Sequence, residues 1–255
     1  MRVVATYNLK GGVGKTAAAV NLAYLAARDG LRTLLWDLDA QGAAGFYLRV
    51  RPGSRGAAAE LLARRKHFTR AIRATDYPRL DMIPADISMR NLDLELKDFK
   101  KSTRRLSKLV RELESDYDLV LLDCAPTMSV TSENVFRVAD ILLVPLIPTH
   151  LSLRAYEQVH DFASQNDANS AVIVPFFSMV DRRKRLHRDL IIEFSRAHPE
   201  VLRSFVPYAS QVERMGEQRA PVNQFADASP GGRAYRALWA ALCERVGLEL
   251  PASDT

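Results

Sequence analysis

Hydrophobic residues along the chain fall into short, nearly continuous runs, separated by stretches in which they recur at helical spacing. Runs of Val, Leu and Ile without polar interruption are typical of parallel strands that are covered on both faces. The runs predict strands at Val3–Tyr7, Thr33–Asp37, Leu80–Pro84, Leu119–Asp123, Ile141–Leu146, Val172–Phe177 and Ser204–Pro207. The helical spacing predicts helices at Lys15–Asp29, Met89–Glu114, Val130–Val138, Leu153–Asn166, Arg185–Arg196 and Arg233–Val246.

Strands and helices alternate along most of the chain. This order predicts an α/β fold with a mainly parallel, twisted sheet and helices on both of its faces. The chain has 255 residues and no linker rich in Pro, Gly or Ser. We therefore expect a single domain over residues 1–250, followed by a frayed tail at 251–255.

The composition excludes several classes of protein. Hydrophobic residues make up 47% of the chain and charged residues 26%, as in a soluble globular protein. No apolar run reaches the roughly 18–20 residues of a membrane span, and the first residues lack the apolar stretch of a signal peptide. Two cysteines, Cys124 and Cys243, are too few for a disulfide scaffold or a four-cysteine metal site. We expect a cytoplasmic protein.

A glycine-rich loop separates the first predicted strand from the first helix. Residues 8–16 read Asn-Leu-Lys-Gly-Gly-Val-Gly-Lys-Thr. Three glycines let backbone N–H groups turn inward around an anion, and the helix N-terminus adds a favourable dipole. Lys15 is placed to reach the β- and γ-phosphates, and the Thr16 hydroxyl to bind Mg²⁺. The loop therefore predicts a P-loop NTPase domain that binds the phosphates of a nucleotide together with Mg²⁺.

Aspartates follow two of the predicted strands. Asp37 and Asp39 lie at the end of one strand, and Asp123 ends another. Carboxylates at the carboxyl ends of parallel strands lie beside the bound ligand of this fold class. We expect Asp123 to hold Mg²⁺ and Asp37 to support the water shell of the metal, because Mg²⁺ prefers hard oxygen ligands.

These motifs together resemble the ParA/MinD group of ATPases. Residues 10–16 resemble their deviant Walker A motif, whose signature lysine is Lys10 here. Residues 37–42 resemble the switch I pattern D-x-D-x-Q-G, with Ala40 where the family usually has proline, and residues 123–126 resemble Walker B followed by switch II. The likeness extends over roughly residues 1–246, and the chain starts at the phosphate loop as short ParA proteins do, without an N-terminal helix-turn-helix.

The resemblance implies roles for particular residues. Lys10 would reach across a dimer interface to the partner's ATP, and Asp39 would position the attacking water, with Lys15 as the third catalytic residue. The nucleotide-binding residues would be Lys10, Gly11, Gly12, Val13, Gly14, Lys15, Thr16, Ala17, Met179 and Pro207. The metal-binding residues would be Thr16, Asp37 and Asp123.

The formal net charge of +6 is unevenly distributed. One basic cluster comprises Arg49, Arg51, Arg55, Arg64, Arg65, Lys66, Arg70 and Arg73. We leave open whether this cluster is a solvated face or a DNA contact. A second cluster, residues 182–188, starts a predicted helix, where cations oppose the helix dipole and so indicate an external anion rather than a solvated basic face. The resemblance implies nonspecific binding of double-stranded DNA through Arg183, Lys184, Arg185, Arg188, Arg214 and Arg219.

The leading hypothesis is a partitioning ATPase of the ParA type. It would form an ATP-dependent homodimer, associate with the nucleoid, and release DNA when a ParB-like or cargo adaptor stimulates hydrolysis. The cargo, the stimulating partner and filament formation stay open.

Two other classes compete with this hypothesis. A MinD-like ATPase would cycle on a membrane, but the apolar stripe of the last predicted helix (Tyr235, Leu238, Trp239, Leu242 and Val246) is better placed to pack on the sheet. The second competing class is a metabolic or electron-transfer relative, such as a biotin-pathway ligase or a nitrogenase-type iron protein. The iron protein is disfavoured because its cluster cysteines are missing, and nothing in the sequence marks a small organic substrate for the ligase.

Overall fold

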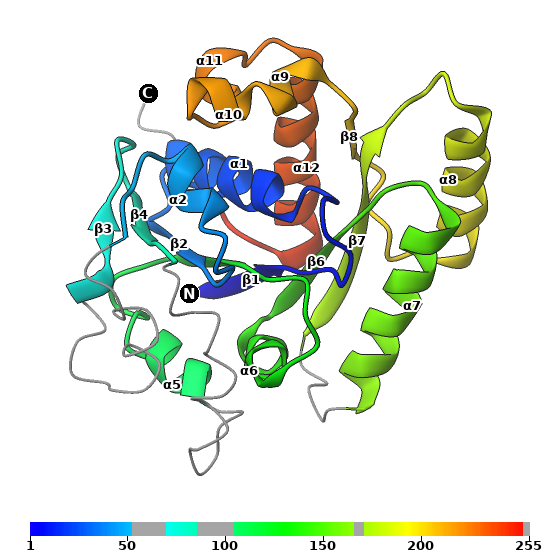
Figure 1. Ribbon diagram of the computed structural model, residues 1–255. Helices are drawn as coiled ribbons and strands as arrows, with labels where there is room; N and C mark the ends of the chain where they lie inside the picture. Colours follow the sequence, from blue (N-terminus) through cyan, green and yellow to red (C-terminus); the bar gives the residue numbers. More distant parts are fainter. Residues whose placement is uncertain (53–69, 86–104, 166–170, 252–255) are drawn as a thin grey trace.

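The computed structural model describes residues 1–52, 70–85, 105–165 and 171–251, and its elements are arranged around one sheet (Figure 1). The strands are β1 (Arg2–Thr6), β2 (Thr33–Asp37), β3 (Arg73–Ala74), β4 (Leu80–Ile83), β5 (Leu119–Asp123), β6 (Ile141–Leu146), β7 (Val172–Val180) and β8 (Phe205–Pro207). Their order across the sheet is β3-β4-β2-β5-β1-β6-β7-β8. Neighbouring strands run parallel except at the β3–β4 edge, so the mainly parallel sheet is confirmed.

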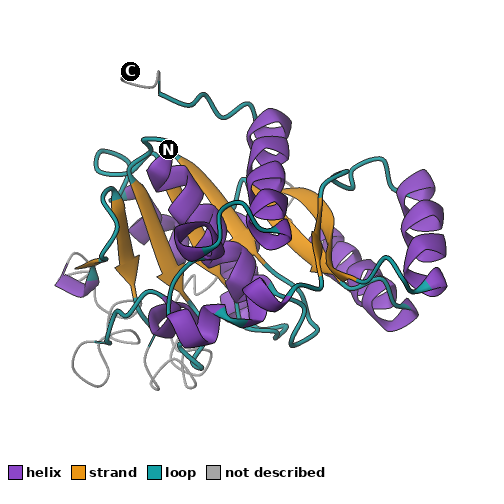
Figure 2. Ribbon diagram, turned by 90° about the horizontal axis from the view of Figure 1, so that it is seen from above, coloured by secondary structure: helices purple, strands orange, loops and turns teal. Residues whose placement is uncertain are grey.

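Helices cover both faces of the sheet, as Figures 1 and 2 show. The longer ones are α1 (Lys15–Arg28), α5 (Arg105–Arg111), α6 (Val130–Val138), α7 (His150–Gln165), α8 (Arg185–Ala197) and α12 (Pro230–Val246). The short ones are α2 (Ala43–Tyr47), α9 (Ser210–Glu213), α10 (Met215–Gln218) and α11 (Val222–Phe225). The predicted helix over 89–114 lies largely outside the described residues, which include only its end as α5.

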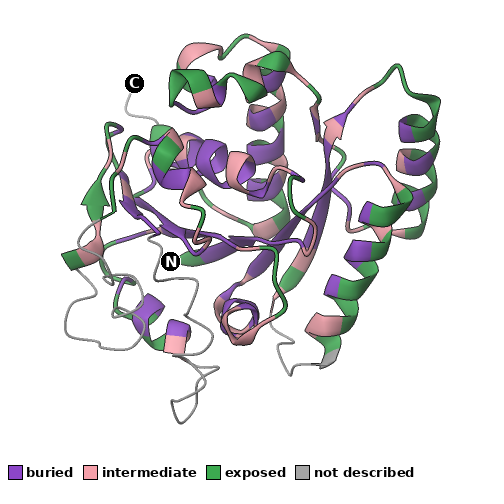
Figure 3. Cartoon of the chain, viewed as in Figure 1, coloured by how far each residue is buried: buried purple, intermediate pink, exposed green. Residues whose placement is uncertain are grey.

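Two hydrophobic cores, one on each face, follow from the alternation of side chains along the strands. In β1, Val3 faces the core beneath α5, α6 and α7, whereas Val4 faces the core beneath α1 and α12. Leu34 and Leu35 divide between the two cores in the same way. The central strands β2, β5 and β6 are therefore buried along their whole length (Figure 3), which is why their sequences read as continuous apolar runs.

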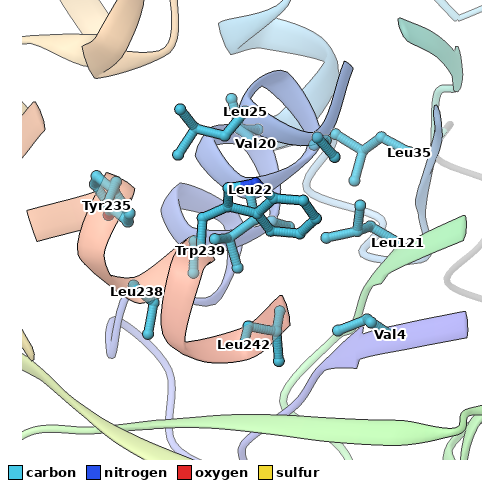
Figure 4. Packing of buried hydrophobic residues seen from close by; sticks show 14 of the residues in the cluster. Val4, Val20, Leu22, Leu25, Leu35, Leu121, Tyr235, Leu238, Trp239 and Leu242 are labelled. Atoms are coloured by element: carbon cyan, nitrogen blue, oxygen red, sulfur yellow. The ribbon is translucent and has the colours of Figure 1, made fainter. Parts of the chain in front are cut away.

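The apolar stripe of α12 packs against α1 and the sheet (Figure 4). Tyr235, Leu238, Trp239 and Leu242 are each at most 4% exposed, so the predicted packing of this helix is confirmed. The Trp239 indole N–H also donates to Asp29 Oδ2 at 2.8 Å, which ties α12 to the end of α1. Within the described ranges, no helix is long and apolar enough to cross a membrane.

The boundaries of α7, α12 and β7 differ from those expected by three residues each, and α7 starts at His150 rather than Leu153. The helix α12 starts at Pro230, because the Ser229 hydroxyl caps it by accepting from the Gly232 N–H at 3.1 Å. Glycine is required there, since a Cβ on Gly232 would clash with the backbone of residues 226–227. The strand β7 continues to Val180 through an irregular register, in which Met179 adopts a left-handed backbone with φ 54°.

The strand β3 and the short helices α2, α9, α10 and α11 were not predicted. Each contains at most five residues, too few to show a helical or alternating period.

Candidate nucleotide site

The carboxyl ends of the central strands bring the acidic residues together. In the register of the sheet, Asp123 of β5 is paired with Thr6 of β1 on one side and with Asp37 of β2 on the other. The Thr6 hydroxyl lies 3.3 Å from Asp123 Oδ1. Two carboxylates that are 86 positions apart in sequence therefore lie side by side at the edge of the sheet from which the glycine loop emerges.

The glycine loop is held open by its backbone conformation. Gly12 and Gly14 adopt positive φ angles of 71° and 93°, and a Cβ on Gly14 would lie 2.9 Å from the Ser178 hydroxyl. The buried Asn8 amide spans the base of the loop, donating to Pro145 O at 2.8 Å and accepting from the Lys10 N–H at 2.9 Å. No side chain caps the N-terminus of α1, so its amides are available to an anion.

The loop borders a cavity of about 470 Å³. Of the predicted site residues, Gly11, Gly12, Gly14, Lys15, Thr16, Ala17, Asp39 and Met179 line it. The structure therefore joins the phosphate loop, the second aspartate of residues 37–42 and the end of β7 in one pocket, although these segments are far apart in the sequence. The volume is in the range of pockets that hold small molecules.

Lys15 is 7% exposed and lies folded along the loop, donating from Nζ to Lys10 O at 3.1 Å. Burial lowers the pKa of its amine, while the nearby Asp123 carboxylate opposes this effect. The hydrogen bond to this neutral carbonyl can be exchanged for a hydrogen bond to a phosphate oxygen, which is stronger because the phosphate is negatively charged.

Asp37 and Asp123 are fully buried, and among the residues that the structure describes the Oδ2 oxygen of each has no hydrogen-bond partner. Burial raises the pKa of both groups, that of Asp123 to about 7, and each carboxylate raises the pKa further where it faces another. Unpaired buried oxygens of this kind suit a hard cation. Thr16, which lowers the pKa of the neighbouring Asp123, completes a donor set that fits Mg²⁺ bound jointly with phosphate oxygens.

The raised pKa of Asp123 predicts a pH dependence of stability. Between the ordinary pKa of 3.8 and about 7, the folded protein binds more protons at this group than the unfolded chain does. The free energy of unfolding of the metal-free protein should therefore fall as the pH rises from about 4 to about 7. Denaturant titrations in EDTA at several pH values measure this slope.

In these titrations Asp123→Asn should flatten the slope, and Asp161→Asn, which changes an exposed carboxylate on α7, should not. Addition of ADP and Mg²⁺ should stabilise the wild type more at pH 7.5 than at pH 5.5, because metal ligands must be deprotonated. An unchanged slope in Asp123→Asn would contradict the assignment of the titration to this pair.

Asp39 occupies a different environment from Asp37. It is half-buried, lines the cavity, and accepts the Gln41 N–H at 3.0 Å through Oδ1. Its own N–H donates to Asp37 Oδ1 at 3.0 Å, which fixes the turn relative to the buried pair. A carboxylate in this position has an oxygen available to a water molecule in the cavity.

Three predicted nucleotide-binding residues do not line the cavity. Val13 is buried in the core, Lys10 lies half-buried at the start of the loop, and Pro207 lies at the end of β8 beside Val180. Conversely, the structure adds Gln41, Ala43, Tyr47, Pro126, Val212 and Glu213 to the lining. Several of these belong to α2 and α9, the short helices that the hydrophobic pattern did not reveal.

The second basic cluster forms an exposed turn between β7 and α8. Arg183 donates to both oxygens of Asp181 at 2.9 and 3.0 Å, and its side chain is 88% exposed. Arg185 pairs with Asp189 at 3.3 Å, and Arg188 donates to the Arg182 carbonyl. Lys184 is exposed and lies at the N-cap of α8, so the four predicted DNA-binding residues of this cluster are accessible, whereas His187 is buried.

Arg214 and Arg219 lie on separate elements from that turn (Figure 1). Arg214 pairs with Glu217 at 3.3 Å. Arg219 donates to Phe46 O at 3.2 Å and lies over the Phe46 ring at 4.9 Å, which connects it to α2 beside the nucleotide cavity. Of the first basic cluster, residues 53–69 lie outside the described residues.

Comparisons with known proteins agree with this geometry. A family model described as an AAA domain matches residues 1–171. The chromosome partitioning protein ParA of Caulobacter vibrioides is 30% identical over 247 residues, covering 92% of this chain and 91% of the relative. The chromosome-partitioning ATPase Soj of Treponema pallidum is 28% identical over 245 residues, covering 94% and 96%.

A solved structure extends the likeness to the whole fold. Cobyrinic acid a,c-diamide synthase from Mycobacterium smegmatis, with a bound ATP analogue and magnesium, superposes with a TM-score of 0.84 at 25% identity and covers 100% of both chains. Together with the glycine loop and the buried aspartate pair, these matches establish that the chain belongs to the ParA family of P-loop ATPases.

Proposed function

We propose that this protein is an ATP-dependent positioning ATPase that dimerises around ATP, binds DNA without sequence preference and releases it on hydrolysis. The observation that supports this proposal best is the cavity that joins the glycine loop, Lys15 and Asp39 beside the buried pair Asp37 and Asp123. Its relatives include chromosome-partitioning ATPases, which makes DNA positioning the favoured use of this site.

The residues around the glycine loop are proposed to bind the phosphates of ATP and the Mg²⁺ ion. Lys15 exchanges its bond with the Lys10 carbonyl for the β- and γ-phosphates, and the open amides at the start of α1 bind the same oxygens. Thr16, Asp37 and Asp123 hold Mg²⁺, directly or through its water. Bound Mg²⁺ offsets the charge of the phosphates and of the leaving group.

Asp39 is proposed to orient the attacking water. Its carboxylate is fixed on one side by the Gln41 N–H and lines the cavity that would receive the γ-phosphate. Met179 and Pro207 are proposed for the base end of the nucleotide, and we add Val212 and Tyr47, which line the same cavity as Met179. Met179 reaches the cavity through its left-handed backbone.

DNA binding is proposed for the exposed turn that carries Arg183, Lys184, Arg185 and Arg188. Asp189 pairs with Arg185 in an exposed pair that is weak enough for a phosphate to displace. Arg183 is held by both oxygens of the partly buried Asp181, and its side chain is 88% exposed to an incoming phosphate. Arginines that contact only phosphates give affinity without sequence information. A dimer presents the turn twice, so ATP-dependent dimerisation would raise the affinity through avidity.

The experiment that tests this function measures binding to a nonspecific DNA duplex with ATP, with ADP and without nucleotide. We expect tight, salt-sensitive binding with ATP only. The double variant Arg183→Ala/Arg185→Ala should weaken this binding by about tenfold or more at 100–200 mM salt and reduce the salt dependence by about one unit per lost phosphate contact.

The matched control is Arg111→Ala/Arg203→Ala, which removes the same charge from exposed positions on other elements. If the two double variants weaken binding equally, the effect is one of net charge and the assignment of the turn fails. Absence of DNA binding in all nucleotide states would reject DNA as the matrix, and ATP-dependent sedimentation with liposomes would then favour the MinD-like alternative.

The proposal also includes a partner and a location. A ParB-like or cargo adaptor would stimulate hydrolysis, and the ATP-bound dimer would reside on the nucleoid. A test for the adaptor is the ATPase rate in the presence of DNA and of proteins encoded beside this chain, and the expected result is stimulation by one of them.

A further inference from the structure

A second cavity, of about 500 Å³, lies at the far end of α1 from the phosphate loop. Lys15 starts this 14-residue helix and Arg28 ends it, so the two cavities are separated by about 20 Å of helix. Its lining residues come from the end of α1, the segment after α2, the turn between β3 and β4, and α11. Nothing in the proposed ATPase cycle uses this cavity.

Three arginines border the second cavity, with one acidic residue among its lining residues. Arg28 pairs with Asp227 at 3.1 Å, and Arg49 pairs with Asp76 at 3.1 Å. Within the described part of the chain, Arg79 has no acidic partner. The cavity therefore presents one unpaired guanidinium and two others held in exposed pairs, an arrangement that attracts an anion.

The aromatic side of the cavity contains a buried hydroxyl group that lacks a partner. Tyr77 is 9% exposed, and its hydroxyl has no hydrogen-bond partner within the structure described. Burial raises the pKa of this phenol, whereas Arg49 lowers it through a weak hydrogen-bonding contact and through its charge. The hydroxyl therefore lies beside the Arg49 guanidinium, makes no hydrogen bond of ordinary geometry and can donate its proton to a ligand in the cavity.

Contacts within the protein hold the side chains of Tyr24 and Gln224 in place beside Tyr77. Tyr24 meets Tyr77 edge to face with ring centroids 5.0 Å apart, and its hydroxyl donates to Gln224 Oε1 at 2.8 Å. Arg49 and Arg79 both adopt left-handed backbone, with φ of 59° and 62°. The aromatic pair offers an apolar face to a planar ring, and the three arginines lie at the border of the same cavity.

We infer that this cavity is a binding site for a small phosphorylated molecule with a planar ring, of the chemical class of a nucleoside monophosphate. The phosphate pairs with Arg79 and Arg49, the Tyr77 hydroxyl donates to the ligand, and the ring lies against the tyrosine pair. The site is distinct from the ATP cavity. Tyr47, the last residue of α2, lines the ATP cavity, and Arg49, which follows α2, lines the second cavity.

The test is equilibrium dialysis of labelled AMP against protein whose first site is saturated with ADP and Mg²⁺, and against Lys15→Ala. We expect one AMP per chain under both conditions. Adenosine, ribose 5-phosphate and inorganic phosphate should each bind at least about tenfold more weakly, because each lacks the phosphate or the ring.

Two variants separate the ligand site from a structural role. Arg79→Asn, which tolerates the left-handed backbone, should weaken AMP binding about tenfold, and Arg203→Asn on another surface should not. Tyr77→Phe should weaken binding several-fold, because the ligand loses the hydroxyl donor, and the melting temperature of this variant measures separately what the contact with Arg49 contributes to the fold.

Three results would overturn the inference. One is the loss of all AMP binding once ADP fills the first site. Another is full AMP affinity in both Arg79→Asn and Tyr77→Phe. The third is inorganic phosphate binding as tightly as AMP, which would show that the tyrosine pair recognises no ring.

Discussion

ATP turnover by Asp39→Ala is expected to fall at least about 100-fold, while ATP binding and ATP-dependent dimerisation persist. General-base or water-positioning groups contribute roughly 10²- to 10⁴-fold to a rate. Asp39 is half-buried and makes its hydrogen bonds within the turn over residues 37–41, so alanine removes the carboxylate from the cavity without opening the core. Asp37 and Asp123, which carry the metal in our proposal, are untouched.

The measurement is basal phosphate release at saturating ATP and Mg²⁺, together with the molar mass of the ATP-bound protein. Asp161→Ala, an exposed aspartate on α7, is the matched control and should retain the wild-type rate. A loss of ATP binding in Asp39→Ala would show that this carboxylate is needed to form the nucleotide site and does not serve only to position the attacking water. A rate within threefold of the wild type would assign water positioning to another group.

The parts of the site that could be predicted from the sequence are those encoded locally. The glycine loop lies between a strand and a helix, and its φ angles of 71° and 93° at Gly12 and Gly14 demand glycine. Asp37 and Asp123 each end an apolar run, and parallel pairing necessarily brings the ends of such runs to one edge. Neither inference requires knowledge of how distant side chains pack.

The parts that could not be predicted depend on packing between segments remote in sequence. Tyr47 and Val212 reach the cavity from α2 and α9, helices of five and four residues with no period to detect. Met179 lines the cavity because β7 becomes irregular and its backbone turns left-handed, which no propensity of methionine favours. The family resemblance pointed to Met179, but hydrophobic patterning alone ended the strand at Phe177.

The basic residues illustrate a similar limit. Charge patterning located the turn at residues 182–188, yet the carboxylates that pair with Arg183 and Arg185 appear only in the structure. Similarly, the contact of Arg219 with Phe46 joins positions 173 apart in sequence. This contact gives an arginine proposed for DNA binding a direct connection to α2 at the nucleotide cavity.

Lys10→Ala is expected to abolish ATP-dependent dimerisation while changing ATP binding by the monomer only a few-fold. The loop uses the backbone of Lys10, because its N–H donates to Asn8 Oδ1 and its carbonyl accepts from Lys15 Nζ. Alanine preserves both bonds and removes only the amine. That amine does not line the cavity of its own chain, which is consistent with our proposal that it acts on the nucleotide of a partner.

Light scattering of the protein with a non-hydrolysable ATP analogue measures the dimer, and calorimetry measures the affinity of the monomer for the analogue. Lys108→Ala, an exposed lysine on α5, is the matched control and should dimerise and bind DNA normally. Since a dimer engages DNA through two copies of the basic turn, Lys10→Ala should also lose about 10²-fold or more in DNA affinity. If Lys10→Ala dimerises with ATP as the wild type does, Lys10 is a loop lysine and the shared nucleotide interface is wrong. If it instead loses ATP binding altogether, its amine serves the nucleotide of its own chain, and the dimer must be explained by other contacts.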